Sequence, residues 1–243
     1  MNMQRRKGVA LWSQIAAQLG ADVQSGAYEA GAKLPTEAQL AAQYGVNRHT
    51  IRRALEELGD ARIIRTEHGR GSFVADEVLD YRIGKRPRFS EFVRGNNRVP
   101  MGEILVLRET QLGELPEAEA AGQALALGPE ANVVILERLG SADARPIALS
   151  RHIFSPAPGL LDALRANAAI TAALASIGIT DFIRSWTRVS ARAPNAREAR
   201  LLRMARTAPL LACEALNTTQ AGVPTEFGTA CYPAPRVQLI FEP

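Results

Sequence analysis

Cysteine and histidine are scarce in this sequence of 243 residues. It contains two cysteines, Cys213 and Cys231, both in strand-like segments, and three histidines, without a Cys-x-x-Cys pair. Because metal sites in proteins are built from clusters of such ligands, we expect neither a metal site nor a cofactor. Two cysteines in a reducing cytosol favour buried thiols over a disulfide.

Long apolar runs and catalytic motifs are also missing. No apolar run approaches the ~18 residues of a membrane helix, and the polar start MNMQRRKG lacks a signal-peptide core. We therefore expect a cytoplasmic protein with no membrane partner. The sequence has no Gly-x-Ser-x-Gly motif, phosphate-binding loop or paired-carboxylate motif, so we do not expect an enzyme.

The most informative part of the sequence is residues 34–74, which read LPTEAQLAAQYGVNRHTIRRALEELGDARIIRTEHGRGSFV. Leu34-Pro35-Thr36-Glu37 is typical of a helix start, with proline in the first turn, and Tyr44-Gly45 ends that helix. Asn47 is a good N-cap for a second helix. One face of the second helix carries Ile51, Ala54, Leu55 and Leu58, and the other carries Arg48, His49, Arg52 and Arg53. Such a helix is suited to the major groove of DNA.

A basic hairpin follows the second helix. Strand-prone runs at residues 63–66 and 72–74 flank the segment Glu67-His68-Gly69-Arg70-Gly71, whose two glycines permit a sharp reversal. The alternative is a charged surface helix beside an ordinary hairpin, but the ordered combination favours DNA binding. An earlier helix, Leu11 to Val23, repeats apolar residues at helical spacing and is expected to cover the DNA-reading helices.

These residues resemble the amino-terminal domain of the GntR family of bacterial transcription regulators. The family pattern LPSE-x-x-L-A, G-V-S-R-x-T-V-R-x-A-L and G-x-G-x-F-V stands here as LPTEAQLA, GVNRHTIRRAL and GRGSFV. The resemblance implies a winged helix-turn-helix domain over residues 8–76, in which Arg48 and Arg52 contact bases or phosphates, Thr50 contacts the backbone and His68-Gly69 reaches the minor groove. The candidate DNA-binding residues are Asn47, Arg48, His49, Thr50, Arg52, Arg53, His68, Gly69 and Arg70.

The next segment is strongly basic. Residues 82–98 contain six Lys or Arg and one Glu, a balance of 6 − 1 = +5, together with proline, glycine and paired asparagines. The composition predicts an inter-domain linker over residues 77–99. It either adds nonspecific attraction to DNA phosphates or serves only as a solvated connector.

Residues 100–241 are expected to form a second domain. Strand-like runs are at residues 102–110, 132–141, 146–154, 182–193, 210–219 and 224–233, and helical patches are near 116–126, 158–177 and 195–204. Short turns join 132–141 to 146–154 and 210–219 to 224–233, so each pair is predicted to form an antiparallel hairpin. The fold class is therefore α+β, built around one antiparallel sheet.

Cationic and polar side chains recur on these predicted strands. Residues two apart on a strand share a face, so Arg184, Trp186 and Arg188 are expected to point one way, and Ser150 and His152 to share a face. Arginine suits phosphate, phosphonate or carboxylate, although a solvated face of salt-bridged arginines is the alternative. We favour a small-anion pocket with the candidate effector-binding residues Arg138, Ser150, His152, Arg184, Trp186, Arg188, Glu214 and Glu226.

Residues 100–241 resemble the effector-binding domain of the HutC-type branch of GntR regulators, whose fold is similar to that of chorismate lyase. The family's E-R-L strand, G-x-P-I/L hairpin and G-x-P-x-E segment stand here as Glu137-Arg138-Leu139, Ala144-Arg145-Pro146-Ile147 and Gly222-Val223-Pro224-Thr225-Glu226. The domain most resembles regulators of phosphonate utilisation. Relatives that sense sugar phosphates often have a second arginine where this chain has Gly140, and glutamate where it has Ser150.

The resemblance implies a homodimeric, ligand-responsive regulator, expected to be a repressor of phosphonate uptake or metabolism genes. Its expected partners are a palindromic operator in double-stranded DNA and a small anionic effector. A regulator of the same build that senses a sugar phosphate or an amino-acid catabolite is the main alternative. A lyase-like enzyme carrying a DNA-binding domain is a third.

Overall fold

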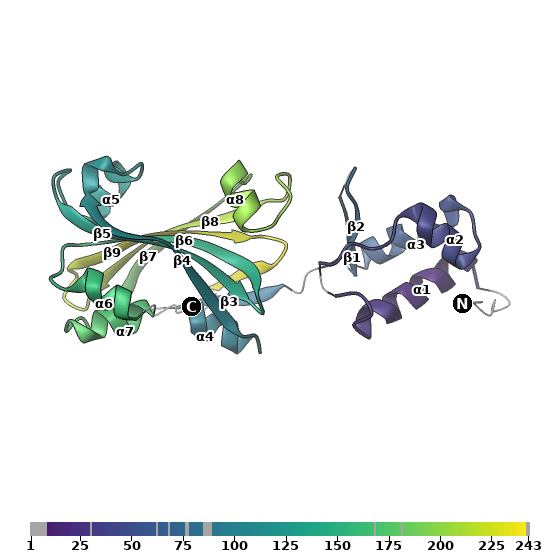
Figure 1. The fold of residues 1–243 in the computed structure, drawn as a ribbon, viewed down its shortest axis with the longest axis horizontal. Helices are drawn as coiled ribbons and strands as arrows, with labels where there is room; N and C mark the ends of the chain where they lie inside the picture. The colour runs from purple at the N-terminus through teal and green to yellow at the C-terminus, as the bar shows by residue number, and fades with distance from the viewer. Residues whose placement is uncertain are drawn as a thin grey trace. The chain divides into compact units, whose positions relative to one another are not determined.

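The computed structural model describes residues 9–29, 31–61, 63–67, 69–75, 78–84, 89–167, 169–180 and 182–241. The chain divides into two compact units, Met1–Glu77 and Val78–Pro243 (Figure 1). Each unit has hydrophobic clusters of its own. Within the described part of the chain, no helix has the length and apolar character that crossing a membrane requires.

The first unit contains three helices and a two-stranded hairpin. The helices are α1 (Leu11–Gln24), α2 (Glu37–Tyr44) and α3 (Arg48–Asp60), and the antiparallel strands are β1 (Ile64–Glu67) and β2 (Gly71–Val74). Ile15 and Leu19 of α1 and Ile51 of α3 are completely buried in one cluster. The expected core stripe of the first helix is therefore confirmed.

Two caps fix where α2 and α3 begin. The Thr36 side chain accepts from the Gln39 N–H and the Gln39 side chain accepts from the Thr36 N–H, which is a capping box. Pro35 therefore lies before the N-cap and not in the first turn, where the sequence analysis placed it. Gly45 ends α2 with a left-handed φ of 63°. Asn47 caps α3 as predicted, by accepting from the Thr50 N–H at 2.8 Å.

The second unit is built on a six-stranded antiparallel sheet in the order β4-β5-β6-β9-β8-β7. Its strands closely match the six predicted runs: β4 (Pro100–Gln111), β5 (Asn132–Ala142), β6 (Arg145–Phe154), β7 (Phe182–Arg192), β8 (Leu210–Thr219) and β9 (Pro224–Pro233). The α+β class is confirmed. Cys213 and Cys231 are free thiols. They lie on adjacent strands but out of register, because Cys213 is opposite Ala230 and Cys231 is opposite Ala212.

Short helices cover both faces of this sheet (Figure 1). On one face lie the 3-10 turn Leu112–Glu114 with α5 (Ala118–Leu125) and, at the other end, α8 (Ala196–Leu201). On the opposite face α6 (Leu160–Ala166) and α7 (Ile170–Ser176) pack against Val134, Leu136 and Phe154. The single helical patch expected at residues 158–177 is thus two helices in the structure.

Part of the segment expected to be a linker belongs to the second unit. Within residues 77–99, β3 (Leu79–Ile83) pairs in parallel with β10 (Val237–Phe241), and α4 (Phe89–Gly95) follows. Tyr81 and Phe92 are buried in a cluster with Tyr232 of the main sheet. The linker was predicted from the basic composition of this segment, but a few apolar residues within the segment pack against the sheet. A folded layer replaces the expected linker here.

Candidate nucleic-acid interface and candidate ligand site

The exposed face of α3 carries the predicted DNA-binding residues. Arg48 and His49 are exposed, and within the described part of the chain neither makes a hydrogen bond or ion pair. The Asn47 side chain accepts from both the N–H and the hydroxyl of Thr50, which therefore supports the first turn. The side chains of Arg48 and His49 thus extend into solvent without partners, from a helix start that the Asn47 cap holds in place.

Arg52 and Arg53 are also exposed, but each has a partner within the unit. Arg52 donates through Nε and Nη2 to the Glu37 carboxylate of α2, at 3.2 and 2.9 Å. The same contact holds the pKa of Glu37 below its ordinary value. The Arg53 guanidinium lies 4.6 Å from the ring centroid of Trp12 on α1. Both arginines are therefore oriented by neighbouring helices.

The hairpin tip is a tight turn with glycines where the backbone requires them. Gly69 and Gly71 have left-handed φ values of 73° and 111°. Arg70 forms an ion pair with Glu67, which also contacts Arg65. His68 lies outside the described residues. The structure confirms a two-stranded hairpin with an arginine at its tip.

In the second unit, the predicted effector residues lie on two opposite faces of the sheet. A β-bulge between Arg184 and Trp186 shifts the register of β7 against β8. Arg184 consequently lies opposite Asn217, while Trp186 lies opposite Leu216 on the other face. The expectation that Arg184 shares a face with Trp186 and Arg188 is wrong, because simple alternation ignores the inserted residue. We call the two sides the His152 face (Arg138, Ser150, His152, Arg184, Glu226) and the Glu137 face (Glu137, Trp186, Arg188, Glu214).

A continuous hydrogen-bond chain runs across the His152 face. His152 Nδ1 lies 2.6 Å from Glu226 Oε1, and His152 Nε2 lies 3.0 Å from the Ser150 hydroxyl. Asn217 Nδ2 donates to Glu226 Oε2 at 2.8 Å, and Arg184 Nε donates to Asn217 Oδ1 at 2.8 Å. Ser150 thus stands at the end of a network whose central members, Glu226 and Asn217, are buried.

Arg138 stands beside this chain without a partner. It lies opposite Ser150 in the β5–β6 register, and it makes no hydrogen bond or ion pair in the described part of the chain. Burial lowers the pKa of its guanidinium. Removing an unpaired arginine partly from water costs free energy of folding, unless an anion binds to its guanidinium. Arg138 is therefore the strongest sign of a ligand on this face.

Two glycines shape the space around Arg138. A Cβ at Gly102 would lie 2.7 Å from Arg138 Nη2, so the guanidinium lies across the bare backbone of β4. A Cβ at Gly140 would lie 2.5 Å from the Phe89 ring of α4. The place where related regulators carry a second arginine is therefore filled by an aromatic ring.

Three further residues of this face were missed by the sequence analysis. Asn217 connects Arg184 to Glu226 and is buried, and its sequence context of a strand gave no signal for this role. Tyr81 and Tyr232 lie with ring centroids 5.5 Å apart, and burial raises the pKa of both phenols. Tyr81 could not be predicted as a residue of this face, because its strand lies in the segment expected to be a linker.

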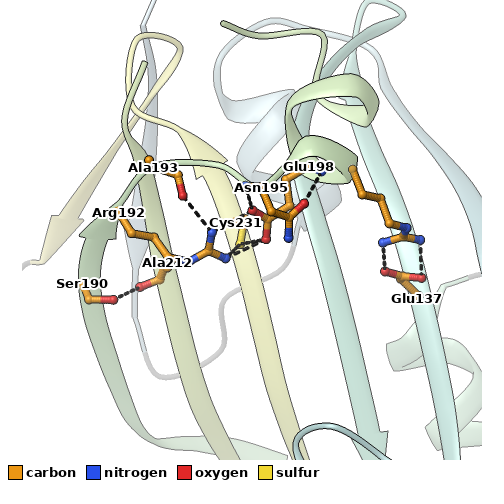
Figure 2. Close-up of polar contacts among 9 residues, drawn as sticks. Glu137, Ser190, Arg192, Ala193, Asn195, Glu198, Ala212 and Cys231 are labelled. Carbon is orange, nitrogen blue, oxygen red and sulfur yellow. Dashed lines mark hydrogen bonds and ion pairs between the residues drawn. The ribbon is translucent and has the colours of Figure 1, made fainter. Parts of the chain in front are cut away.

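The Glu137 face carries a charged cleft of about 430 Å³ beside α8. Figure 2 shows its two tight ion pairs. Arg192 donates to both oxygens of Glu198 at 2.7 and 2.6 Å, and Arg197 donates to both oxygens of Glu137 at 2.7 and 2.8 Å. Arg188 pairs with Glu214 at 2.8 Å. Trp186 packs near Phe227, with ring centroids 6.4 Å apart.

The arginines of the two faces therefore differ in kind. Those of the Glu137 face, Arg188, Arg192 and Arg197, neutralise carboxylates of the same protein. The pairs of Arg192 and Arg197 also join α8 to the sheet. Arg138 on the His152 face has no such carboxylate within the described residues. A small anion would thus find an available cation on the His152 face.

Two family models match the chain. The model of bacterial regulatory proteins of the gntR family matches residues 11–74, and the model of the UTRA domain matches residues 107–238. The chain belongs to the GntR family. It is a transcription regulator with an amino-terminal helix-turn-helix and a carboxy-terminal UTRA domain, and regulators of this family bind DNA operators and small-molecule effectors.

Two relatives match this chain over nearly their whole length. The chain is 30% identical over 243 residues to a helix-turn-helix transcriptional regulator of Rhizobium meliloti, covering 99% of this chain and 98% of the relative. It is 29% identical over 245 residues to the probable transcriptional regulator PhnF of Escherichia coli, covering 95% and 94%. The crystal structure of PhnF from Mycobacterium smegmatis superposes with a TM-score of 0.60 at 22% identity, covering 94% of this chain and 98% of that one, and supports the fold.

Proposed function

We propose that this GntR regulator is a homodimeric repressor of genes for phosphonate uptake or metabolism, and that it responds to a small phosphorus oxyanion. The observation that carries the proposal is Arg138, a half-buried cation without a partner in the described part of the chain, opposite Ser150 in the strand register. The resemblance to the phosphonate-type regulators supports it. A Cβ at Gly140 would lie 2.5 Å from the Phe89 ring, so this chain has no room for a second arginine at Gly140.

The ligand test is a binding panel on the full-length protein. Methylphosphonate, inorganic phosphate, glucosamine 6-phosphate and urocanate are compared by thermal shift and isothermal titration calorimetry. Methylphosphonate is expected to stabilise the protein and to bind more tightly than the other three. Preference for the sugar phosphate or for urocanate would identify the alternative regulator of the same build, and turnover of a compound would identify an enzyme.

The operator test concerns the first turn of α3. We propose that Arg48, His49, Thr50 and Arg52 contact the major groove, that the hairpin tip contacts the backbone or minor groove, and that two protomers read the half-sites of an inverted repeat. Because Arg48 is exposed and unpaired, Arg48→Ala is expected to cost about 1–3 kcal/mol in operator binding, measured by gel shift. Unchanged affinity would remove Arg48 from the interface. Glu57→Ala, on an exposed position of the same helix near its end, is the matched control.

A further inference from the structure

Glu37 places a carboxylate among the candidate DNA-binding residues of α3. It is the first residue of α2, and the capping box at the start of that helix fixes the turn that carries it. The hydrogen bond from Arg52 is the main reason that the pKa of Glu37 is lowered, and the charges of Arg48 and His49 act in the same direction. Proteins bind DNA phosphates with lysine and arginine. Glu37 therefore opposes nonspecific attraction to DNA rather than adding to it.

The Glu37 carboxylate binds one edge of the Arg52 guanidinium. Arg52 Nε donates to Oε1 at 3.2 Å and Nη2 donates to Oε2 at 2.9 Å, so the two side chains form a bidentate pair. A guanidinium has five N–H donors in one rigid plane, and this pair uses only the Nε edge. Among the described residues, the guanidinium makes no further hydrogen bond. The edge between Nη1 and Nη2 is therefore left to contact DNA.

This pair lies on the surface, where it contributes little to the stability of the fold. The side chains of Arg52 and Glu37 are 54% and 36% exposed, and solvent screens exposed ion pairs strongly. Arg48 lies one turn earlier on the same side of α3 and has no carboxylate partner in the described part of the chain. Arg48 thus offers its full charge to DNA, whereas Arg52 is neutralised and held in one orientation.

An arginine that is neutralised and oriented distinguishes bases from phosphates. Phosphates occur at every position of a duplex and attract any unpaired cation, which raises affinity without any sequence preference. Guanine presents two acceptors, O6 and N7, at a fixed spacing in the major groove, and one edge of a guanidinium matches both. Pairing with a carboxylate reduces the attraction of Arg52 to phosphates but leaves the donor edge that fits guanine.

We propose that Glu37 is the positioning residue for base recognition by Arg52. It holds the free edge of the guanidinium toward a guanine in the major groove, and its negative charge weakens binding to DNA that lacks this guanine. Glu37 acts through Arg52 and does not itself contact a base. The inference rests on the proposed function, because it takes Arg52 to contact the major groove, but it does not depend on the identity of the effector.

Selection from a pool of randomised DNA duplexes tests the base preference. Full-length wild-type protein, Arg52→Ala and Glu37→Gln are each mixed with the same pool, and the bound DNA is sequenced. The preference that Arg52→Ala loses identifies the position read by Arg52. Glu37→Gln is expected to weaken the preference for guanine at that position about tenfold and to leave the other positions unchanged. Combined with Arg52→Ala, Glu37→Gln should cause no further loss of preference.

The salt dependence of binding to a duplex without the selected site gives the second readout. In Glu37→Gln the charge of Arg52 becomes available to a phosphate. Nonspecific binding should therefore become tighter, and the slope of log K against log salt should steepen by about one per protomer. A purely structural role of Glu37 would change the melting temperature instead. Glu57→Gln removes the same charge from an exposed position on another side of α3 and is the matched control, expected to keep the wild-type slope.

The outcomes separate the two proposals. If the wild type shows no base preference, or Arg52→Ala loses none, the proposed contact of Arg52 with the operator is wrong, and the role of Glu37 is wrong with it. If Arg52→Ala loses a preference while Glu37→Gln keeps both that preference and the wild-type slope, only the role of Glu37 is wrong.

A crystal structure of the wild-type protein with the selected duplex decides the question without a variant, should Glu37→Gln fail to fold. Arg52 is expected to contact a guanine while it remains paired with Glu37. An Arg52 that has left Glu37 for a phosphate would overturn the inference.

Discussion

Arg138 illustrates how one residue can be assigned by the partner that it lacks. The sequence analysis assigned eight residues to a single pocket, and the structure distinguishes the arginines among them by whether a carboxylate already neutralises their charge. Arg188 is paired with Glu214, whereas Arg138 lies over the bare backbone of Gly102 without a carboxylate among the described residues. An arginine that no carboxylate of the protein neutralises can contribute its full charge to the binding of an anionic ligand.

Arg138→Gln should therefore separate ligand binding from stability. Loss of a charge-assisted contact of about 1.5–3 kcal/mol predicts methylphosphonate binding weakened by about ten- to a hundredfold. The free protein should be at least as stable as the wild type, because a desolvated and unpaired cation is removed. Calorimetry and urea unfolding measure the two effects. Arg188→Gln is the matched control on the opposite face, and an equal loss of affinity in that variant would contradict the assignment.

Glu198 is a second residue whose role can be tested, because its ion pair with Arg192 stabilises the folded state. Its ion pair with Arg192 keeps the pKa of Glu198 below the ordinary value of 4.5. A lowered pKa in the folded state means that the contribution to stability is present above pH 4.5 and is lost as the pH falls through the folded value. Because solvent partly screens Arg192, we expect Glu198→Gln to lose about 1–2 kcal/mol at pH 7.

Urea unfolding at pH 7 and pH 3.5 measures that change. The difference between Glu198→Gln and the wild type should shrink at the lower pH, because below pH 4.5 the Glu198 carboxyl of the unfolded chain takes up a proton and stabilises the unfolded state. Glu214→Gln, which removes an exposed pair with Arg188, should change the free energy of unfolding little at either pH. A loss that is equal at the two pH values would show that the charge of Glu198 is not responsible.

At the scale of elements, most strands could be predicted from the sequence and two small features could not. Alternating apolar residues and turn residues determined β4 to β9 within a few residues of their observed ends. The bulge in β7 inserts one residue without a characteristic sequence, so the side chain of Arg184 was assigned to the wrong face. The strand β3 is short, and its apolar residues alternate with charged ones beside a basic segment.

The helix α4 provides a prediction at this scale. A Cβ at Gly140 would lie 2.5 Å from the Phe89 ring, so Gly140→Ala forces the ring and its helix to shift. We expect a loss of about 1–3 kcal/mol in the free energy of unfolding, measured in urea. Gly102→Ala is the control: its Cβ would meet the flexible end of Arg138, so stability should hold while ligand affinity falls. Equal stability of the two variants would show that the Phe89 contact contributes little.

At the scale of the whole molecule, the second unit begins at residue 78, whereas the second domain was expected to begin at residue 100, after a linker over residues 77–99. A fragment of residues 78–243 should fold and bind methylphosphonate with the affinity of the full-length protein. A fragment of residues 100–243 lacks β3 and α4 and exposes the apolar side chains that pack against Tyr232. We expect it to be insoluble or unfolded by circular dichroism. A well-folded shorter fragment would contradict the role assigned to this layer.

The parallel pairing of β3 with β10 has a consequence for the order of events during synthesis. Residues 79–83 leave the ribosome long before their partner strand, residues 237–241, is made. Domains generally fold in order from the amino terminus while the chain grows. The helix-turn-helix unit can therefore fold on the nascent chain well before its sensor is complete. A newly made regulator passes through an interval in which it has a DNA reader but no finished receptor for the signal.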